Sequence, residues 1–182
     1  MKNNNVRNVV AIGIGTALYV VLSFIYIPLG AIPNTGLMPS LSIIAFFSAV
    51  FGSVVGAAIG LIGQLIYSLI TGGVWWSWLF PMAIPASAIG LFKGKYNVKE
   101  GGFGGRQIVV FNIAQVIGNA IAWAFLAPVL DILIYSEPAN KVFLQGIGAF
   151  VGDIIVMGVL GTILLAAYSK VSGKSAGLKK ED

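Results

Sequence analysis

The chain has no cysteine and no histidine, and charged side chains make up only 9% of its 182 residues. The first absence excludes disulfides and thiolate chemistry, and the second removes the usual proton shuttle and the commonest metal ligand. Soluble domains carry roughly 25% charged residues, so this chain has too few charges to cover a surface that faces water. With 58% hydrophobic residues, the composition predicts an integral membrane protein, and the length predicts one domain.

Motifs that carry enzyme chemistry are missing as well. The sequence contains no Gly-x-x-x-x-Gly-Lys-[Ser/Thr] P-loop, no Gly-x-Ser-x-Gly motif and no zinc-ligand set. We therefore expect no catalytic residue, no bound metal and no cofactor. If ATP drives an activity of this protein, another protein is expected to bind the ATP.

Apolar stretches separated by Gly-, Pro- or charge-rich breaks predict an all-α, six-helix membrane bundle that forms a single domain over residues 1–182. The expected spans are about 9–27, 40–51, 54–70, 78–92, 108–133 and 142–168. Three prolines and two glycines exclude a regular helix over residues 28–39. We expect this apolar segment to pack over the outer end of the bundle as a lid or a re-entrant loop. In the fourth span, Pro81 and Pro85 predict a kink.

The distribution of lysine and arginine predicts the orientation of the bundle. With the N-terminus in the cytoplasm, six spans also place the loop 93–107 and the C-terminus there, and ten of the eleven basic residues then lie inside. The ten are Lys2, Arg7, Lys93, Lys95, Lys99, Arg106, Lys170, Lys174, Lys179 and Lys180. The net charge of +5 therefore indicates topology and contact with anionic lipid, and we expect no nucleic-acid partner.

Three of the four tryptophans, Trp75, Trp76 and Trp78, follow Gly72-Gly73 between two apolar segments. Tryptophan gathers at membrane–water interfaces and also in pockets for flat ligands, because it joins a large ring system to one N–H donor. An interfacial belt and the wall of a binding site at the outer surface are both open interpretations of this cluster.

Polar side chains near the outer ends of the helices complete a candidate pocket for a small, flat, polar molecule. With the three tryptophans, the predicted ligand-binding residues are Asn34, Thr35, Gln64, Tyr67, Glu137, Asn140 and Lys141. Deeper in the membrane, Asn112, Gln115 and Asn119 are three and four residues apart and therefore share one helix face. For this deep group, and for Asp153, hydrogen bonding between helices is the alternative to a functional site.

Small residues recur at four-residue spacing in the first span, where Ala11 pairs with Gly15 and Gly13 with Ala17. Such spacing lets a second helix approach the backbone closely. That helix belongs either to this protein or to another membrane protein, so the four residues are candidate partner-docking residues. The third span has the same spacing over Gly52–Gly60, where we expect packing within the protein.

Several stretches together carry a resemblance to a known family. They are residues 9–18, Ile32-Pro33-Asn34-Thr35, 50–56, Trp75-Trp76-Ser77-Trp78, 134–143 and 161–165. In this order they resemble the substrate-binding S components of energy-coupling factor (ECF) vitamin transporters, in the branch often labelled riboflavin-type. The similarity spans nearly the whole chain. Histidine is common in the family where this chain has Gln64, and an acidic residue where it has Tyr67 or Ser68.

The resemblance implies a multi-pass protein of the bacterial plasma membrane that captures a vitamin from outside. It also implies a transmembrane coupling protein (T component), which the small-residue face of the first helix contacts, and two cytosolic ATPases. The expected ligand is a small aromatic vitamin or precursor, with hydroxymethylpyrimidine or pyridoxine first and riboflavin second. More distant alternatives are a small channel or structural subunit, and a lipid-modifying enzyme with Asp153 or Glu137 as its acid.

Overall fold

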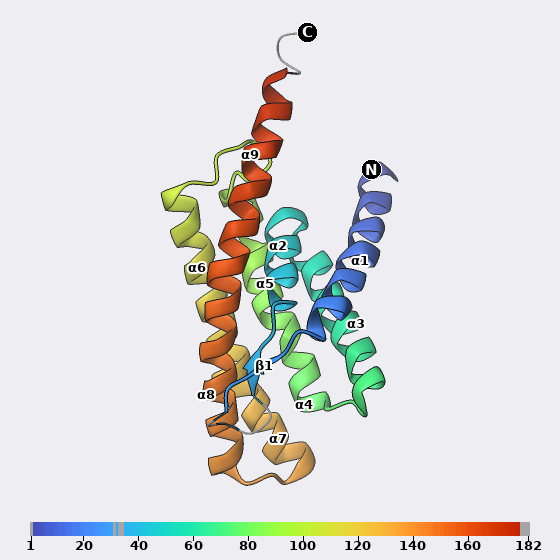
Figure 1. Cartoon of the computed structure of the whole chain (residues 1–182), viewed down its shortest axis with the longest axis vertical. Helices are drawn as coiled ribbons and strands as arrows, with labels where there is room; N and C mark the ends of the chain where they lie inside the picture. The colour runs from blue at the N-terminus through green and yellow to red at the C-terminus, as the bar shows by residue number, and fades with distance from the viewer. Residues whose placement is uncertain (1, 31, 33–34, 179–182) are drawn as a thin grey trace.

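The computed structural model describes residues 2–30, 32 and 35–178, and these residues are mostly helical (Figure 1). The α-helices are α1 (Lys2–Ser23), α2 (Leu41–Phe51), α3 (Ser53–Thr71), α4 (Trp76–Leu79), α5 (Ala83–Leu91), α6 (Gly105–Asn119), α7 (Ala127–Tyr135), α8 (Ala139–Val156) and α9 (Thr162–Leu178). The 3-10 helix η1 (Phe80–Met82) joins α4 to α5, and η2 (Lys93–Lys95) follows α5. Two π-helices, η3 (Ala120–Leu126) and η4 (Met157–Gly161), join α6 to α7 and α8 to α9. The predicted all-α class is confirmed.

Four continuous helical stretches are long and apolar enough to cross a membrane. They are Asn4–Ser23, Ser53–Thr71, Gly105–Tyr135 and Ala139–Lys174, and they make the chain a membrane protein. The second and fourth expected spans correspond to two shorter apolar stretches, α2 and the series α4, η1, α5. The latter contains an interruption where the prolines predicted one, because Pro81 stands in η1.

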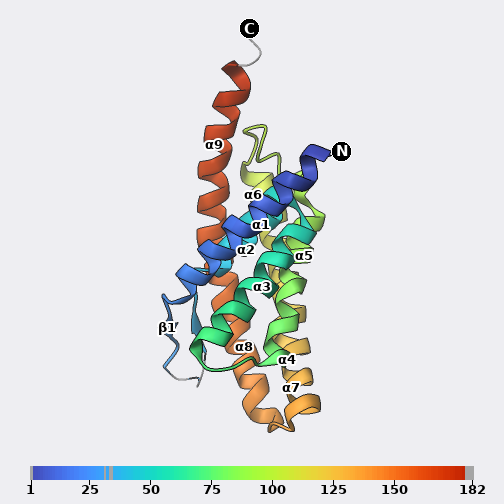
Figure 2. The same cartoon turned by 90° about the vertical axis from the view of Figure 1, so that its right-hand side faces the viewer.

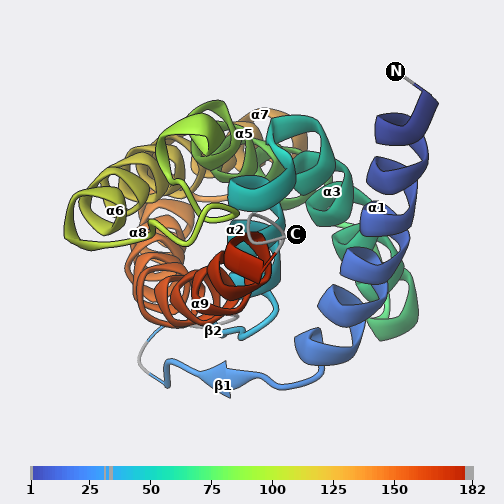
Figure 3. The same ribbon diagram turned by 90° about the horizontal axis from the view of Figure 1, so that it is seen from above.

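The helices are arranged with α1 and α3 on one side of the molecule and α6 and α8 on the other (Figures 1 and 3). The start of α1, the connection from α5 to α6 and the end of α9 lie at one end (Figures 1 and 2). The turn from α7 to α8 lies at the opposite end. The segments richest in lysine and arginine are therefore gathered at one end of the bundle.

Glycines on α3 allow neighbouring helices to pack closely, as their spacing predicted. A Cβ atom at Gly56 would overlap the Ser48 side chain of α2, so no larger residue fits there without a shift. At Gly63 a Cβ atom would lie 2.5 Å from Cδ1 of Tyr19, which is fully buried on α1. The small residues of α3 thus fix the distance to the helices on both sides.

The Pro- and Gly-rich segment after α1 contains a short hairpin that the sequence did not predict. Strands β1 (Ile27–Pro28) and β2 (Gly36–Leu37) pair antiparallel, with Ile27 opposite Leu37. The absence of a side chain on Gly36 admits the Tyr26 ring, because a Cβ atom there would lie 2.5 Å from Cζ of Tyr26. The segment packs against α8, where a Cβ on Gly148 would meet Ile32 and Thr35.

Candidate functional site

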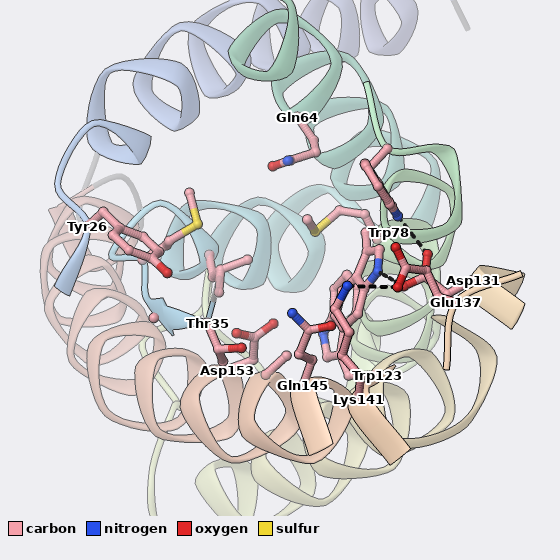
Figure 4. Close-up of a pocket in the computed structure, with 16 residues that line it drawn as sticks. Tyr26, Thr35, Gln64, Trp78, Trp123, Asp131, Glu137, Lys141, Gln145 and Asp153 are labelled. Carbon is pink, nitrogen blue, oxygen red and sulfur yellow. Dashed lines mark hydrogen bonds and ion pairs between the residues drawn. The ribbon is translucent and has the colours of Figure 1, made fainter. Parts of the chain in front are cut away.

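A cavity of about 380 Å³ lies among the hairpin segment, α3, α4, η3, α7 and α8 (Figure 4). It is lined by Tyr26, Thr35, Gly36, Met38, Leu41, Gln64, Trp75, Trp78, Met82, Trp123, Asp131, Glu137, Lys141, Gln145, Ala149 and Asp153. Its volume falls in the range of about 300–1,000 Å³ that is typical of small-molecule sites. Aromatic and aliphatic walls with a few polar groups give it the composition of a ligand pocket.

Two tryptophans from different helices form a flat wall of the cavity. The rings of Trp78 on α4 and Trp123 on η3 are stacked, with centroids 5.8 Å apart and planes 14° from parallel. Trp123 stands in a π-helical segment, a form of helix that is frequent at functional sites. The arrangement offers an apolar surface for an aromatic ring of a ligand.

The Asp131 carboxylate holds the tryptophan segment onto α7. It is 2% exposed and accepts hydrogen bonds from the indole N–H groups of Trp75, at 2.6 Å, and Trp78, at 2.8 Å. The Ser77 hydroxyl donates to the same carboxylate. Three donors from four consecutive residues thus converge on one acceptor. These bonds fix the orientation of the Trp75 and Trp78 rings, which both line the cavity, as Figure 4 shows for Trp78.

Gln64, which lines the cavity from α3, is held by the first helix. The Tyr19 hydroxyl donates to Gln64 Oε1 at 2.7 Å, and Gln64 Nε2 donates to the Ser68 hydroxyl at 3.3 Å. Tyr26 also lines the cavity, outside the helices that are long enough to cross a membrane, and burial followed by the proximity of Tyr67 raises the pKa of its phenol. The Tyr26 hydroxyl is therefore a neutral donor and acceptor at physiological pH.

The charged groups of the cavity lie at two depths. At the entrance, Lys141 Nζ is 2.7 Å from Glu137 Oε2, with the lysine 48% exposed and the glutamate 22% exposed. Farther along α8, Gln145 and Asp153 are buried and also line the cavity (Figure 4). Residues 141, 145, 149 and 153 are four apart, so one face of α8 lines the cavity from the exposed Lys141 to the buried Asp153.

Six of the predicted ligand-binding residues line this cavity. They are Thr35, Gln64, Trp75, Trp78, Glu137 and Lys141. Three others do not: Tyr67 packs edge-on against Phe24, Trp76 stacks on Phe80 facing outward, and Asn140 is exposed. Asn34 lies outside the described residues. Contact of these residues with a ligand stays a prediction.

The sequence interpretation missed much of the lining. Tyr26, Met38, Leu41, Met82 and Trp123 carry no local signal, because each stands in an apolar or proline-rich stretch like many others. A signal existed for the acidic residues, since carboxylates within apolar helices usually face a cavity. That rule identifies Asp131 and Asp153 as candidates for the lining.

The deep polar residues of α6 form a hydrogen-bonded ladder, as one of the two interpretations predicted. Trp123 Nε1 donates to Asn119 Oδ1 at 2.9 Å, and Asn119 Nδ2 donates to Gln115 Oε1 at 3.1 Å. Asn112 Nδ2 donates across to the Thr162 hydroxyl of α9 at 3.3 Å. The ladder joins α6 to α9, and its bond to Trp123 Nε1 fixes the orientation of the Trp123 ring.

The small residues of α1 divide between two faces. Ala11 is 5% exposed, and a Cβ atom on Gly15 would lie 2.4 Å from Cδ1 of Ile59, so this pair packs against α3. Gly13 and Ala17 are exposed, and a Cβ atom on Gly13 would meet nothing within 4 Å. Of these four residues, Gly13 and Ala17 can contact another protein without rearrangement of the helices, whereas Ala11 and Gly15 cannot.

Comparisons with known proteins agree on one family. A family model described as "ECF-type riboflavin transporter, S component" matches residues 3–170. A UPF0397 protein of Lactobacillus acidophilus is 46% identical over 180 residues, covering 98% of this chain and 97% of that protein. UPF0397 proteins of Lacticaseibacillus casei, 45% identical over 182 residues, and Staphylococcus aureus, 46% over 179, cover at least 97% of each chain. No solved structure shows significant similarity.

Proposed function

The chain belongs to the family of ECF-type riboflavin transporter S components, and we propose that it captures a small aromatic vitamin or precursor for ATP-driven uptake. S components work with a T component and ATPases as a general property of the family. In our proposal, two cytosolic ATPases supply the energy and this chain supplies the binding site. Its role is therefore that of a transport component in the bacterial plasma membrane, without catalysis of its own.

The cavity with its paired tryptophans is the observation that carries the proposal. It combines a flat aromatic wall, amide and hydroxyl groups and several carboxylates in a volume suited to one small molecule. Hydroxymethylpyrimidine or pyridoxine suits this combination first, because a small ring can lie on Trp78 while its polar edge meets Gln64 and the α8 residues. Riboflavin, which the family name contains, is the alternative.

A six-span topology with both chain ends in the cytoplasm accompanies this proposal. It is supported by the gathering of the α1 start, the α5–α6 connection and the α9 end at one end of the bundle (Figure 1). These segments carry most of the basic residues, which favours the cytoplasmic side for them. The cavity entrance at Lys141, near the α7–α8 turn, then faces outward.

For the contact with the T component, we favour the exposed face of α1. Gly13 and Ala17 stand four residues apart within a stripe of exposed apolar residues that includes Val10, Ile14 and Val21. A helix of a partner can approach such a face closely. The inward pair, Ala11 with Gly15, would then contribute by setting the position of α1 on α3.

The test is to produce the chain together with a T component and two ATPases and to measure complex formation and ATP-dependent vitamin accumulation. Gly13→Leu should abolish co-purification and uptake while ligand binding in detergent stays near that of the parent. Ile14→Leu, on the same exposed face, is the matched control and should change neither. If the parent associates with no such module and no vitamin accumulates, the transport proposal is wrong. If Gly13→Leu assembles normally, the contact lies on another face.

A further inference from the structure

We propose that the ligand carries a positively charged nitrogen and that the Asp153 carboxylate is its counter-ion. This inference rests on the proposed function, because it concerns the same cavity. It narrows the ligand to an organic cation, such as a ring with an ammonium substituent or a protonated ring nitrogen.

The charges of the cavity lining do not balance. Three carboxylates line it, those of Asp131, Glu137 and Asp153, whereas Lys141 is the one basic residue of the lining. Lys141 is 2.7 Å from Glu137 and thus compensates that group. Among the described residues of the lining, no lysine or arginine remains for the other two carboxylates.

The two remaining carboxylates, Asp131 and Asp153, differ in the hydrogen bonds that they accept. Asp131 accepts three hydrogen bonds from the α4 segment, which occupy most of the acceptor sites of a carboxylate. Asp153 interacts with the Trp123 side chain, but among the described residues no set of three donors like that of Asp131 surrounds it. Figure 4 shows its carboxylate directed toward the open middle of the cavity, away from the Asp131 cluster.

Asp153 is buried, so its carboxylate requires a compensating charge or strong hydrogen bonds. Its side chain is 6% exposed and belongs to the membrane-crossing stretch Ala139–Lys174. A buried charge is costly unless an opposite charge or strong hydrogen bonds compensate it, and intramembrane carboxylates usually pair or mark a ligand path. A cationic ligand in the cavity would supply the opposite charge that Asp153 lacks among the lining residues, which gives the pocket a specific chemical preference.

The surroundings favour an organic cation over a metal ion. Within residues 2–30, 32 and 35–178, no group of three or more aspartate or glutamate side chains lies close enough to hold a metal ion. Trp123 and Trp78 line the same cavity as this carboxylate, and indole faces attract cations as well as aromatic rings. A flat ring that bears a positive nitrogen satisfies both features at once.

Matched pairs of compounds test the inference directly. Pyridoxamine and pyridoxine share a ring and differ in an ammonium for a hydroxyl group, and so do the aminomethyl and hydroxymethyl forms of 4-amino-2-methylpyrimidine. Calorimetric titration of the purified protein in detergent gives a ratio of dissociation constants for each pair. In at least one pair, the ammonium compound should bind about tenfold or more tightly, since a hydrogen bond between two charged groups is stronger than one to a neutral hydroxyl group.

Variants assign the preference to one residue. Asp153→Asn should bring the ratio close to one, and Asp153→Glu should keep a preference for the ammonium compound. Asp131→Asn, the same change on the other wall, should keep the ratio even where both affinities fall. The thermal transition of each variant is measured alongside, and Asp153→Ser takes the place of Asp153→Asn if the latter does not fold.

Three outcomes would overturn the inference: a parent that prefers the hydroxyl compounds, a folded Asp153→Asn protein that keeps the ammonium preference, or a parent that binds only neutral riboflavin. In each case the proposed transport function would still stand if ATP-dependent uptake is observed. That function fails separately, when the chain forms no complex with a T component and ATPases.

Discussion

Replacement of Asp131 by alanine should destabilise the protein and disorganise the tryptophan wall. The change removes the acceptor for two indole N–H groups and one hydroxyl group. A buried donor left without an acceptor costs about 1–3 kcal/mol. Trp75 is 48% exposed and can turn toward water, whereas Trp78 is partly buried and Ser77 fully buried, so only the last two retain the full penalty. We expect Asp131→Ala to lower the free energy of unfolding by about 2–5 kcal/mol.

Asp131→Asn provides an intermediate step, because its single amide oxygen can still accept while its NH₂ group faces a donor. Asp131→Asn should therefore lower the free energy of unfolding less than Asp131→Ala does, by about 1–3 kcal/mol. Tyr135→Phe is the control, since it removes only a 3.1 Å bond to the backbone N–H of Trp76 at an exposed site. The assay is equilibrium unfolding in mixed micelles, followed by circular dichroism. A loss below about 1 kcal/mol for Asp131→Ala would refute the role assigned to this carboxylate.

Three further predictions concern the site, the packing and the topology. Trp78→Ala should weaken ligand binding by about fivefold or more, whereas Trp76→Ala, which alters a ring outside the cavity, should not; equal effects would contradict the assignment. Gly90→Ala should lower the melting temperature, because its Cβ would lie 2.1 Å from a backbone nitrogen at the start of α3; an unchanged value would mean that the helices can separate freely. Single cysteines at Lys99 and Ser136 should react with impermeant reagents from opposite sides of the membrane, and labelling from one side would overturn the six-span topology.

The sequence predicted those features that depend on local covalent properties. Helix class follows from the long apolar stretches, the interruption in the fourth stretch from Pro81, and the close helix contacts from the four-residue spacing of glycines around Gly56. The sequence left two interpretations open for the Trp75–Trp78 cluster and did not indicate which rings would face inward; in the structure Trp75 and Trp78 line the cavity, and their contact with a ligand stays a prediction.

The remainder of the site depends on contacts between distant segments. Asp131 is joined to the tryptophans across more than fifty residues, and nothing near it in sequence specifies that contact. The difference between Gly13 and Gly15 has the same cause. Their spacing shows that a helix could pack closely on either residue, but the position of α3 decides that Gly15 is covered and Gly13 is exposed. The β1–β2 pairing also requires tertiary support, because strands of two residues are too short to be stable alone.

Calorimetric titration of the purified protein with a panel of vitamins and precursors tests the central claim most directly. The panel contains the two matched pairs, riboflavin and thiamine, and each is titrated into the parent and into folded Trp78→Ala. We predict saturable binding of one small aromatic compound per chain, weakened in the variant. If no compound binds the folded parent, or if the one that binds is indifferent to Trp78, the cavity is not the capture site.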